Sequence, residues 1–214
     1  MKSNTIIPQV MDLKSITLLP EKDAPAIVEV NPQDGFFINA RRSDDFRIRA
    51  SIYAMLKQAQ SSLPSGYRFM VFETYRSFAK QETLWNNTNK QMKERYPDLG
   101  DEDLFRICEN FTACPYDGIG SGHQAACAVD ITLCDENGTE YFMGTEMHEK
   151  SEKTKTEAAG LTAEETRLRA LLRKSLEDAG FINYPAEWWH YSYGDHQWAF
   201  LTGRKEAFFG ILDI

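Results

Sequence analysis

One aspartate inside a strand-like run constrains this chain of 214 residues more than any other feature. Residues 127–134 read CAVDITLC, a mixture of apolar and β-branched residues that is typical of a buried strand. Asp130 lies in the middle of this run, where a carboxylate is costly to bury without a partner. His123 lies shortly before the run, in a glycine-rich loop. A metal ion, an arginine or a ring of backbone amides could partner Asp130, and these residues alone leave the alternatives open.

The other segments predict an α+β fold with a single domain, in which helices flank a central, mainly antiparallel sheet. Further strands are predicted over residues 67–75, 139–143, 181–184 and 188–193. Apolar residues at helical spacing and cap residues predict four helices: from Ser43 to just before Pro64, from Ser77 to about Arg95, a short one after Asp101, and one from the capping box of Thr162 and Glu165 to Gly180.

The first forty residues have a different pattern from the rest. They contain four of the eight prolines, separated by short apolar runs. Prolines at this density interrupt helices and central strands, so an extended, wrapping segment with one edge strand is expected. We therefore divide the chain into an N-terminal segment, residues 1–40, packed on a domain formed by residues 41–214.

Composition and charge exclude several classes of partner. The formal net charge of −8 repels a phosphate backbone, so no nucleic-acid partner is expected. The N-terminal residues lack the apolar core of a signal peptide, and no stretch approaches the length of a membrane span. The four cysteines lack C-x-x-C spacing. We expect a reduced, cytoplasmic protein that does not bind a membrane, and the oligomeric state is left open.

Two short patterns connect the chain to a known family. Residues 121–130 read SGHQAACAVD and residues 187–190 read EWWH. Together they resemble the S-x-H-x-x-G-x-A-x-D and E-x-W-H signatures of the zinc D-Ala-D-Ala metallopeptidases, the family that includes the VanX-like D-alanyl-D-alanine dipeptidases. The similarity extends over roughly residues 67–200.

The resemblance implies a set of site residues. His123, Asp130 and His190 would hold one zinc ion per chain, with water in the fourth position. Glu187 would be the general base, and Arg76 would stabilise the charge that develops on the scissile carbonyl. The alternatives for the last two are a surface carboxylate and an ion pair at a helix start. The implied reaction is hydrolysis of D-alanyl-D-alanine to D-alanine.

Candidate substrate-binding residues follow from the same resemblance and from the neighbouring sequence: Ser121, Tyr75, Trp189, Glu146 and Glu149. Aromatic clusters are more often core, so Trp189 has that alternative, and a serine in a glycine-rich loop is more often a turn residue. Glu187 and His190 are three residues apart and would lie on opposite faces of a regular strand. A bend near residues 186–187 is therefore expected.

Two departures from the family pattern bear on the substrate. Ala126 replaces the glycine of the first signature, which a slightly shifted backbone could absorb. His148 stands where the dipeptidases carry the aspartate that holds the substrate ammonium, unless Glu146 or Glu149 does so instead. A peptidase without that anchor would act as a carboxypeptidase on longer peptidoglycan stem peptides. A further alternative is a binding protein that keeps the zinc fold without catalysis, as in the Hedgehog signalling domains.

Overall fold

The computed structural model describes residues 6–41, 43–149 and 151–214. Its centre is a five-stranded sheet, whose strands in spatial order are β3 (Phe37–Ile38), β5 (Arg68–Glu73), β6 (Ala128–Cys134), β8 (His190–Ser192) and β7 (Ile182–Asn183). β3 runs parallel to β5, and every other neighbouring pair is antiparallel. The chain is thus a single α+β domain with a mainly antiparallel sheet, as predicted.

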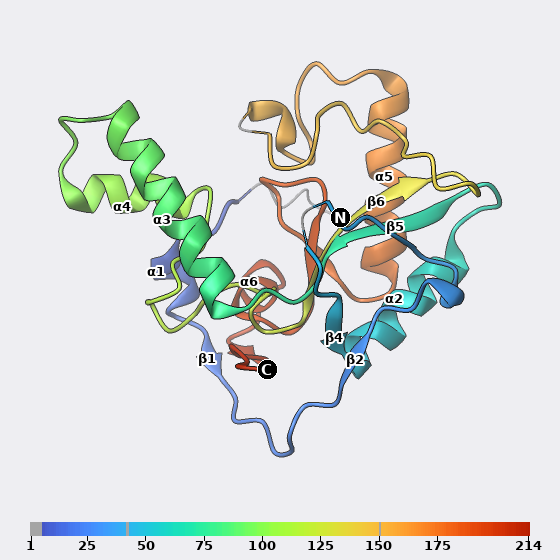
Figure 1. Cartoon of the computed structure of the whole chain (residues 1–214), viewed down its shortest axis with the longest axis horizontal. Coiled ribbons are helices and arrows are strands. Elements are labelled where there is room, and N and C mark those ends of the chain that lie inside the picture. Colours follow the sequence, from blue (N-terminus) through green and yellow to red (C-terminus); the bar gives the residue numbers. More distant parts are fainter. Residues whose placement is uncertain (1–5, 42, 150) are drawn as a thin grey trace.

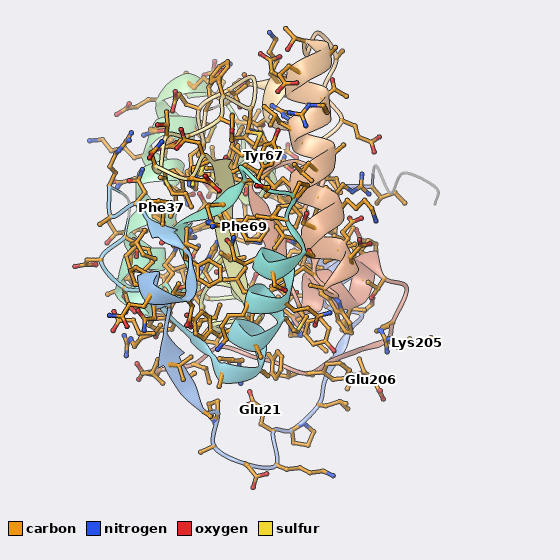
Figure 2. The ribbon with its side chains drawn as sticks, turned by 90° about the vertical axis from the view of Figure 1, so that its right-hand side faces the viewer. Glu21, Phe37, Tyr67, Phe69, Lys205 and Glu206 are labelled. Atoms are coloured by element: carbon orange, nitrogen blue, oxygen red, sulfur yellow. The ribbon has the colours of Figure 1, made fainter. Side chains whose placement is uncertain are left out.

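Two helices cover one face of this sheet. α2 (Ala50–Ser62) and α5 (Ala163–Asp178) contact each other, and α5 also contacts β6 and β7 (Figure 1). Phe69 of β5 lies among the side chains that fill the interior beside them (Figure 2). Ile131 and Leu133 of β6 belong to the same cluster. Because side chains alternate along a strand, Asp130 points to the opposite face, away from these helices.

A helical hairpin projects from one side of the sheet. It consists of α3 (Phe78–Arg95) and α4 (Asp101–Glu109), coloured green in Figure 1. Ser77 caps α3 by accepting a hydrogen bond from the backbone nitrogen of Lys80, as its sequence position predicted. The hairpin has a small apolar cluster of its own, formed by Trp85, Met92, Leu104, Cys108 and Cys114. It therefore packs as a unit beside the sheet.

The N-terminal segment wraps around the domain. After α1 (Val10–Leu13), β1 (Thr17–Leu18) pairs with β9 (Glu206–Ala207) near the end of the chain, where Figure 2 labels Glu206. β2 (Ile27–Glu29) pairs with β4 (Arg47–Arg49), and the 3-10 helix η1 (Pro32–Asp34) leads into β3. The segment therefore contributes an edge strand to the central sheet. The boundary at residue 40 stays a prediction.

The structure corrects two sequence expectations and adds a helix that the sequence did not predict. The helix expected from Ser43 begins at Ala50, because residues 47–49 pair with β2 instead. No strand forms at residues 139–143, where a single bridge joins Cys134 to Glu140 before the chain turns at Gly144 with φ of 95°. The helix α6 (His196–Leu201) was not predicted, and Asp195 caps it. The 3-10 helix η2 (Glu152–Thr154) lies in the charged segment before α5.

The aromatic and sulfur-containing residues lie mainly in the interior. Trp188, Trp189, Tyr191 and Trp198 are all buried, and Tyr193 is half-buried. The four cysteines are buried. Among the described residues, no helix has the combination of length and hydropathy that a membrane-spanning helix requires.

Candidate metal centre

Three side chains from separate segments meet on the face of the sheet that α2 and α5 leave uncovered. His123 precedes β6, Asp130 lies within β6, and His190 is the first residue of β8, directly opposite Asp130 in the strand register. His123 Nε2 lies 3.2 Å from Asp130 Oδ1 and 3.1 Å from His190 Nδ1. His190 Nδ1 lies 3.0 Å from Asp130 Oδ1. The structure thus brings together the three residues expected to bind the metal.

The donor atoms have the spacing that a tetrahedral ion requires. Zinc binds imidazole nitrogen and carboxylate oxygen at about 2.0–2.2 Å, which places two ligands of a tetrahedron roughly 3.3–3.5 Å apart. The observed separations of 3.0 to 3.2 Å are close to this value. The same three residues form a group whose candidate ligand atoms all lie within 4.8 Å of one another. The residues present therefore fit a zinc ion.

A backbone carbonyl prepares His123 for coordination. His123 Nδ1 lies 2.7 Å from the carbonyl oxygen of Thr74, in a buried position. A carbonyl can only accept a hydrogen bond, so Nδ1 carries the proton. In the neutral imidazole the lone pair is then on Nε2, the atom that faces Asp130 and His190. The ring is fixed in the tautomer that can bind a metal.

The charge of the centre also suits a cation. Burial alone raises the pKa of Asp130, but the nearby His123, His148 and His190 lower it well below its ordinary value. The carboxylate is therefore an anion at neutral pH. Burial opposes protonation of His190, yet its hydrogen bond to Asp130 raises its pKa. These histidines stabilise the negative charge of Asp130 in the way that a bound metal ion would.

Glu187 reaches the site through a turn. Residues 185–189 form turns, in which the Glu187 nitrogen donates to Tyr184 O (3.0 Å) and the His190 nitrogen donates to Glu187 O (3.3 Å). The bend expected near residues 186–187 is confirmed. Burial raises the pKa of the half-buried Glu187 above its ordinary value, and the charges of His190 and Arg76 partly oppose the rise. A carboxylate with a raised pKa beside a metal centre is suited to proton transfer.

Arg76 is held in place by two side chains. Its Nε and Nη2 donate to the two carboxylate oxygens of Glu73 (3.1 and 2.5 Å), and its Nη1 donates to Gln81 Oε1 (3.0 Å). The ion-pair alternative for Arg76 is therefore present in the structure. A guanidinium has five N–H groups, so two remain for a further acceptor. Ser121 Oγ also contacts Gln81 Oε1 (3.4 Å), which places Ser121 on the same side of the site as Arg76.

The other candidate substrate-binding residues lie in different environments. The Tyr75 hydroxyl donates to Leu212 O (3.1 Å), so its polar end faces the C-terminal segment. Trp189 is buried with its ring 5.1 Å from that of His148. Glu146 and Glu149 are exposed on the segment that carries His148. The structure thus packs Trp189 against His148 and directs the Tyr75 hydroxyl to the C-terminal segment.

Ala126, which stands at the glycine position of the family signature, has a backbone conformation that is unusual for a residue with a side chain. Its φ is 52°, in the left-handed region that disfavours side chains. The expectation that a slightly shifted backbone absorbs this change stays a prediction. The loop is anchored by Arg49, whose Nε donates to Ala125 O (2.7 Å) and whose backbone nitrogen donates to Ala126 O (3.0 Å). Glu21 pairs with the same guanidinium (2.7 Å).

Sequence reasoning missed two residues that support the site, Glu73 and Gln81. Glu73 lies in a run of aromatic and β-branched residues, just as Asp130 does, so the same argument about a buried carboxylate would have found it. Gln81 gave no such signal, because a glutamine in an amphipathic helix is ordinary. The sequence marked His148 only as the position where the family's aspartate is absent. In the structure its Nε2 lies 3.4 Å from Asp130 Oδ2.

Comparison with known proteins identifies relatives over most of the chain. A model of peptidase family M15, described as D-ala-D-ala dipeptidase, matches residues 46–207. A D-alanyl-D-alanine dipeptidase of Synechocystis is 28% identical over 181 residues, covering 74% of this chain and 73% of that protein. A D-alanyl-D-alanine dipeptidase of Enterococcus faecium is 26% identical over 166 residues, covering 75% and 77%.

A solved structure shares the architecture. The LdcB LD-carboxypeptidase, described in connection with peptidoglycan recognition, superposes with a TM-score of 0.50 over 87% of this chain and 82% of its own. The two chains are 19% identical, so this likeness concerns the fold alone.

Proposed function

The chain belongs to peptidase family M15, which is described as D-ala-D-ala dipeptidase. We propose that it is a zinc-dependent enzyme that hydrolyses D-alanyl-D-alanine to D-alanine. One observation carries the proposal: His123 Nε2, Asp130 Oδ1 and His190 Nδ1 lie 3.0 to 3.2 Å apart on one face of the sheet. The substrate class comes from the named relatives, which are D-alanyl-D-alanine dipeptidases.

The three ligands would hold one zinc ion per chain. When bound, zinc supplies a positive charge next to the substrate carbonyl and a water molecule whose pKa is lowered towards roughly 7. Glu187 accepts the proton of the attacking water and delivers it to the leaving amine. Its raised pKa helps it to carry that proton between the two steps.

Arg76 and Ser121 would bind the substrate on the other side of the reacting carbonyl. The two N–H groups that Arg76 does not use on Glu73 and Gln81 can donate to the carbonyl oxygen as negative charge develops there. Gln81 contacts both this guanidinium and the hydroxyl of Ser121. In this assignment the Ser121 hydroxyl binds the terminal carboxylate of the substrate. In this assignment Glu146 or Glu149 takes the substrate ammonium.

A second candidate function is favoured by His148 and by a cavity that the preceding residues line. His148 offers no negative charge to an ammonium group, and Glu146 and Met147, just before it, line a cavity of about 350 Å³ together with Phe72, Thr132, Met143 and Trp188 among others. A cavity of this size can hold at least one further residue of a longer peptide. The chain would then be a carboxypeptidase that removes D-amino acids from peptidoglycan stem peptides.

One assay separates the two activities. The zinc-loaded protein is incubated with free D-Ala-D-Ala and, separately, with an N-acylated peptide that ends in D-Ala-D-Ala, and products are followed by mass spectrometry. Hydrolysis of the free dipeptide, abolished by a chelator and by Glu187→Ala, supports the dipeptidase. Hydrolysis of the acylated peptide alone supports the carboxypeptidase. Full zinc occupancy without turnover of either peptide would contradict both.

A further inference from the structure

The two oxygens of the Asp130 carboxylate face different histidines. Oδ1 lies within 3.2 Å of both His123 Nε2 and His190 Nδ1. Oδ2 lies 3.4 Å from Nε2 of His148, which comes from the segment between β6 and α5. One oxygen thus faces the place where an ion would bind, and the other faces away from it, towards His148.

The nitrogen of His148 has no competing neighbour. Its Nε2 is buried and makes no hydrogen bond within the described ranges of the chain, and the acceptor atom that it faces is Asp130 Oδ2 at 3.4 Å. A buried ring nitrogen without a partner is costly, so the approach to Asp130 Oδ2 is the interaction that accounts for this position. The distance of 3.4 Å is slightly longer than the roughly 2.7–3.2 Å of an N–H···O hydrogen bond, so a small movement of either side chain forms the bond.

The backbone holds His148 in an unusual conformation. Its φ is 59°, in the left-handed region that residues with a side chain seldom adopt. Its ring packs against that of Trp189, with 5.1 Å between the ring centres. Arg169 fixes the surrounding segment by donating to Met143 O (2.7 Å) and Lys155 O (2.6 Å). The Trp189 ring and the left-handed backbone thus hold the imidazole in the position from which it faces Asp130.

His148 does not belong to the ligand set itself. The group in which all candidate ligand atoms lie within 4.8 Å of one another consists of His123, Asp130 and His190. His148 approaches the oxygen that the two ligand histidines do not contact. This arrangement fits a residue that orients a ligand better than one that coordinates the ion directly.

We propose that His148 is a positioning residue for the metal centre: its Nε2–H donates to Oδ2 of Asp130 and keeps Oδ1 as the single carboxylate oxygen directed at the ion. Hydrogen bonds of this kind orient metal ligands and strengthen metal binding. Holding the carboxylate to one oxygen also leaves a coordination position for water. The inference rests on the proposed zinc site and is independent of which peptide the enzyme cleaves.

The test measures metal affinity rather than turnover. Zinc affinity is determined by competition with a chromophoric chelator for the wild-type protein, His148→Ala and His148→Gln, with Lys153→Ala, an exposed side chain of the same segment, as the control. We expect His148→Ala to weaken zinc binding about 10- to 100-fold, and His148→Gln, whose amide can still donate, to recover most of the loss. Lys153→Ala should bind zinc as the wild type does.

The absorption spectrum of the cobalt-loaded proteins gives a second readout. Free rotation of Asp130 in His148→Ala should alter the ligand-field bands, whereas His148→Gln should resemble the wild type. Equal zinc affinity and equal spectra for His148→Ala and the wild type would overturn this role and leave the zinc site intact. A loss beyond about 1,000-fold that glutamine does not restore would show direct coordination and also overturn it. A wild-type protein that binds no metal would contradict the zinc site itself.

Discussion

Both carboxylate oxygens of Glu73 accept hydrogen bonds from the guanidinium of Arg76, at 3.1 and 2.5 Å, in a position that is almost inaccessible to solvent. Lys80 Nζ adds a second cation at 2.8 Å. Glu73 is also opposite Asp130 in the register of β5 and β6. The strand pair therefore places the residue that orients Arg76 beside the aspartate of the metal centre.

This ion pair predicts how stability depends on pH. Burial raises the pKa of Glu73, but Arg76 more than offsets this and lowers it from 4.5 to about 2. A depressed pKa in the folded state stabilises the protein above pH 4.5, by on the order of 3 kcal/mol, and this contribution is lost as the pH falls towards 2. In denaturant titrations, Glu73→Gln should therefore be less stable than the wild type at pH 7. The difference in free energy of unfolding between the two proteins should narrow below pH 4.5. Glu102→Gln removes an exposed ion pair and should change little at any pH. A constant gap across this range would contradict the account.

Ala126 predicts a strain that glycine would relieve. Its left-handed φ of 52° costs about 1–2 kcal/mol for a residue with a Cβ. Ala125 is also buried and does not have a positive φ, so Ala125→Gly loses a buried methyl group without relieving strain. Ala126→Gly should therefore be more stable than Ala125→Gly by about 1–2 kcal/mol in chemical denaturation. Equal stabilities for the two variants would show that the loop carries no strain at Ala126.

The contacts of Arg169 predict that this side chain stabilises the segment that carries His148. Its guanidinium donates to the carbonyl oxygens of Met143, Lys153 and Lys155, and burial lowers its pKa to about 10. A lysine cannot reach three carbonyls in this geometry, and each one left unsatisfied costs about 1–3 kcal/mol. Arg169→Lys should therefore lower the free energy of unfolding and accelerate amide hydrogen exchange over residues 143–155. Arg167→Lys, an exposed site on the same helix, should leave both unchanged.

The position of Glu187 predicts that a substitution there reduces catalysis and leaves metal binding unchanged. The residue lies in the turn before His190 and is not part of the ligand group. Glu187→Gln preserves its shape and removes its ability to accept a proton, so the turnover number should fall about 100- to 10,000-fold. The zinc content should remain that of the wild type. Loss of zinc from this variant, or turnover equal to the wild type, would contradict the role of Glu187 as the base.

The metal centre was accessible to sequence reasoning because its signals are local. Asp130 interrupts an apolar strand, and the two short patterns around His123 and His190 have ordinary spacing within the family. Their convergence depends on β6 and β8 being neighbours, which the register of Asp130 opposite His190 provides. The sequence order alone does not specify that register.

The correction to the helix predicted from Ser43 involves a contact between distant segments. The helix predicted from Ser43 loses its first turns because residues 47–49 pair with residues 27–29, an interaction that no local window contains. Similarly, Glu73 and Gln81 become important only when Arg76 lies between them. The contact between His148 and Asp130 depends on a left-handed residue, which the sequence does not mark as a glycine would.

The central claim is that His123, Asp130 and His190 together hold one zinc ion. Zinc binding by the metal-free wild-type protein, His123→Ala, Asp130→Ala and His190→Ala, measured by calorimetric titration, tests it most directly. His196→Ala, a histidine outside the group, serves as the control. We predict one tight site in the wild type and in His196→Ala, and loss of that site in each of the other three variants. A wild-type protein that binds no zinc, or three variants that bind it as tightly as the wild type does, would contradict the account.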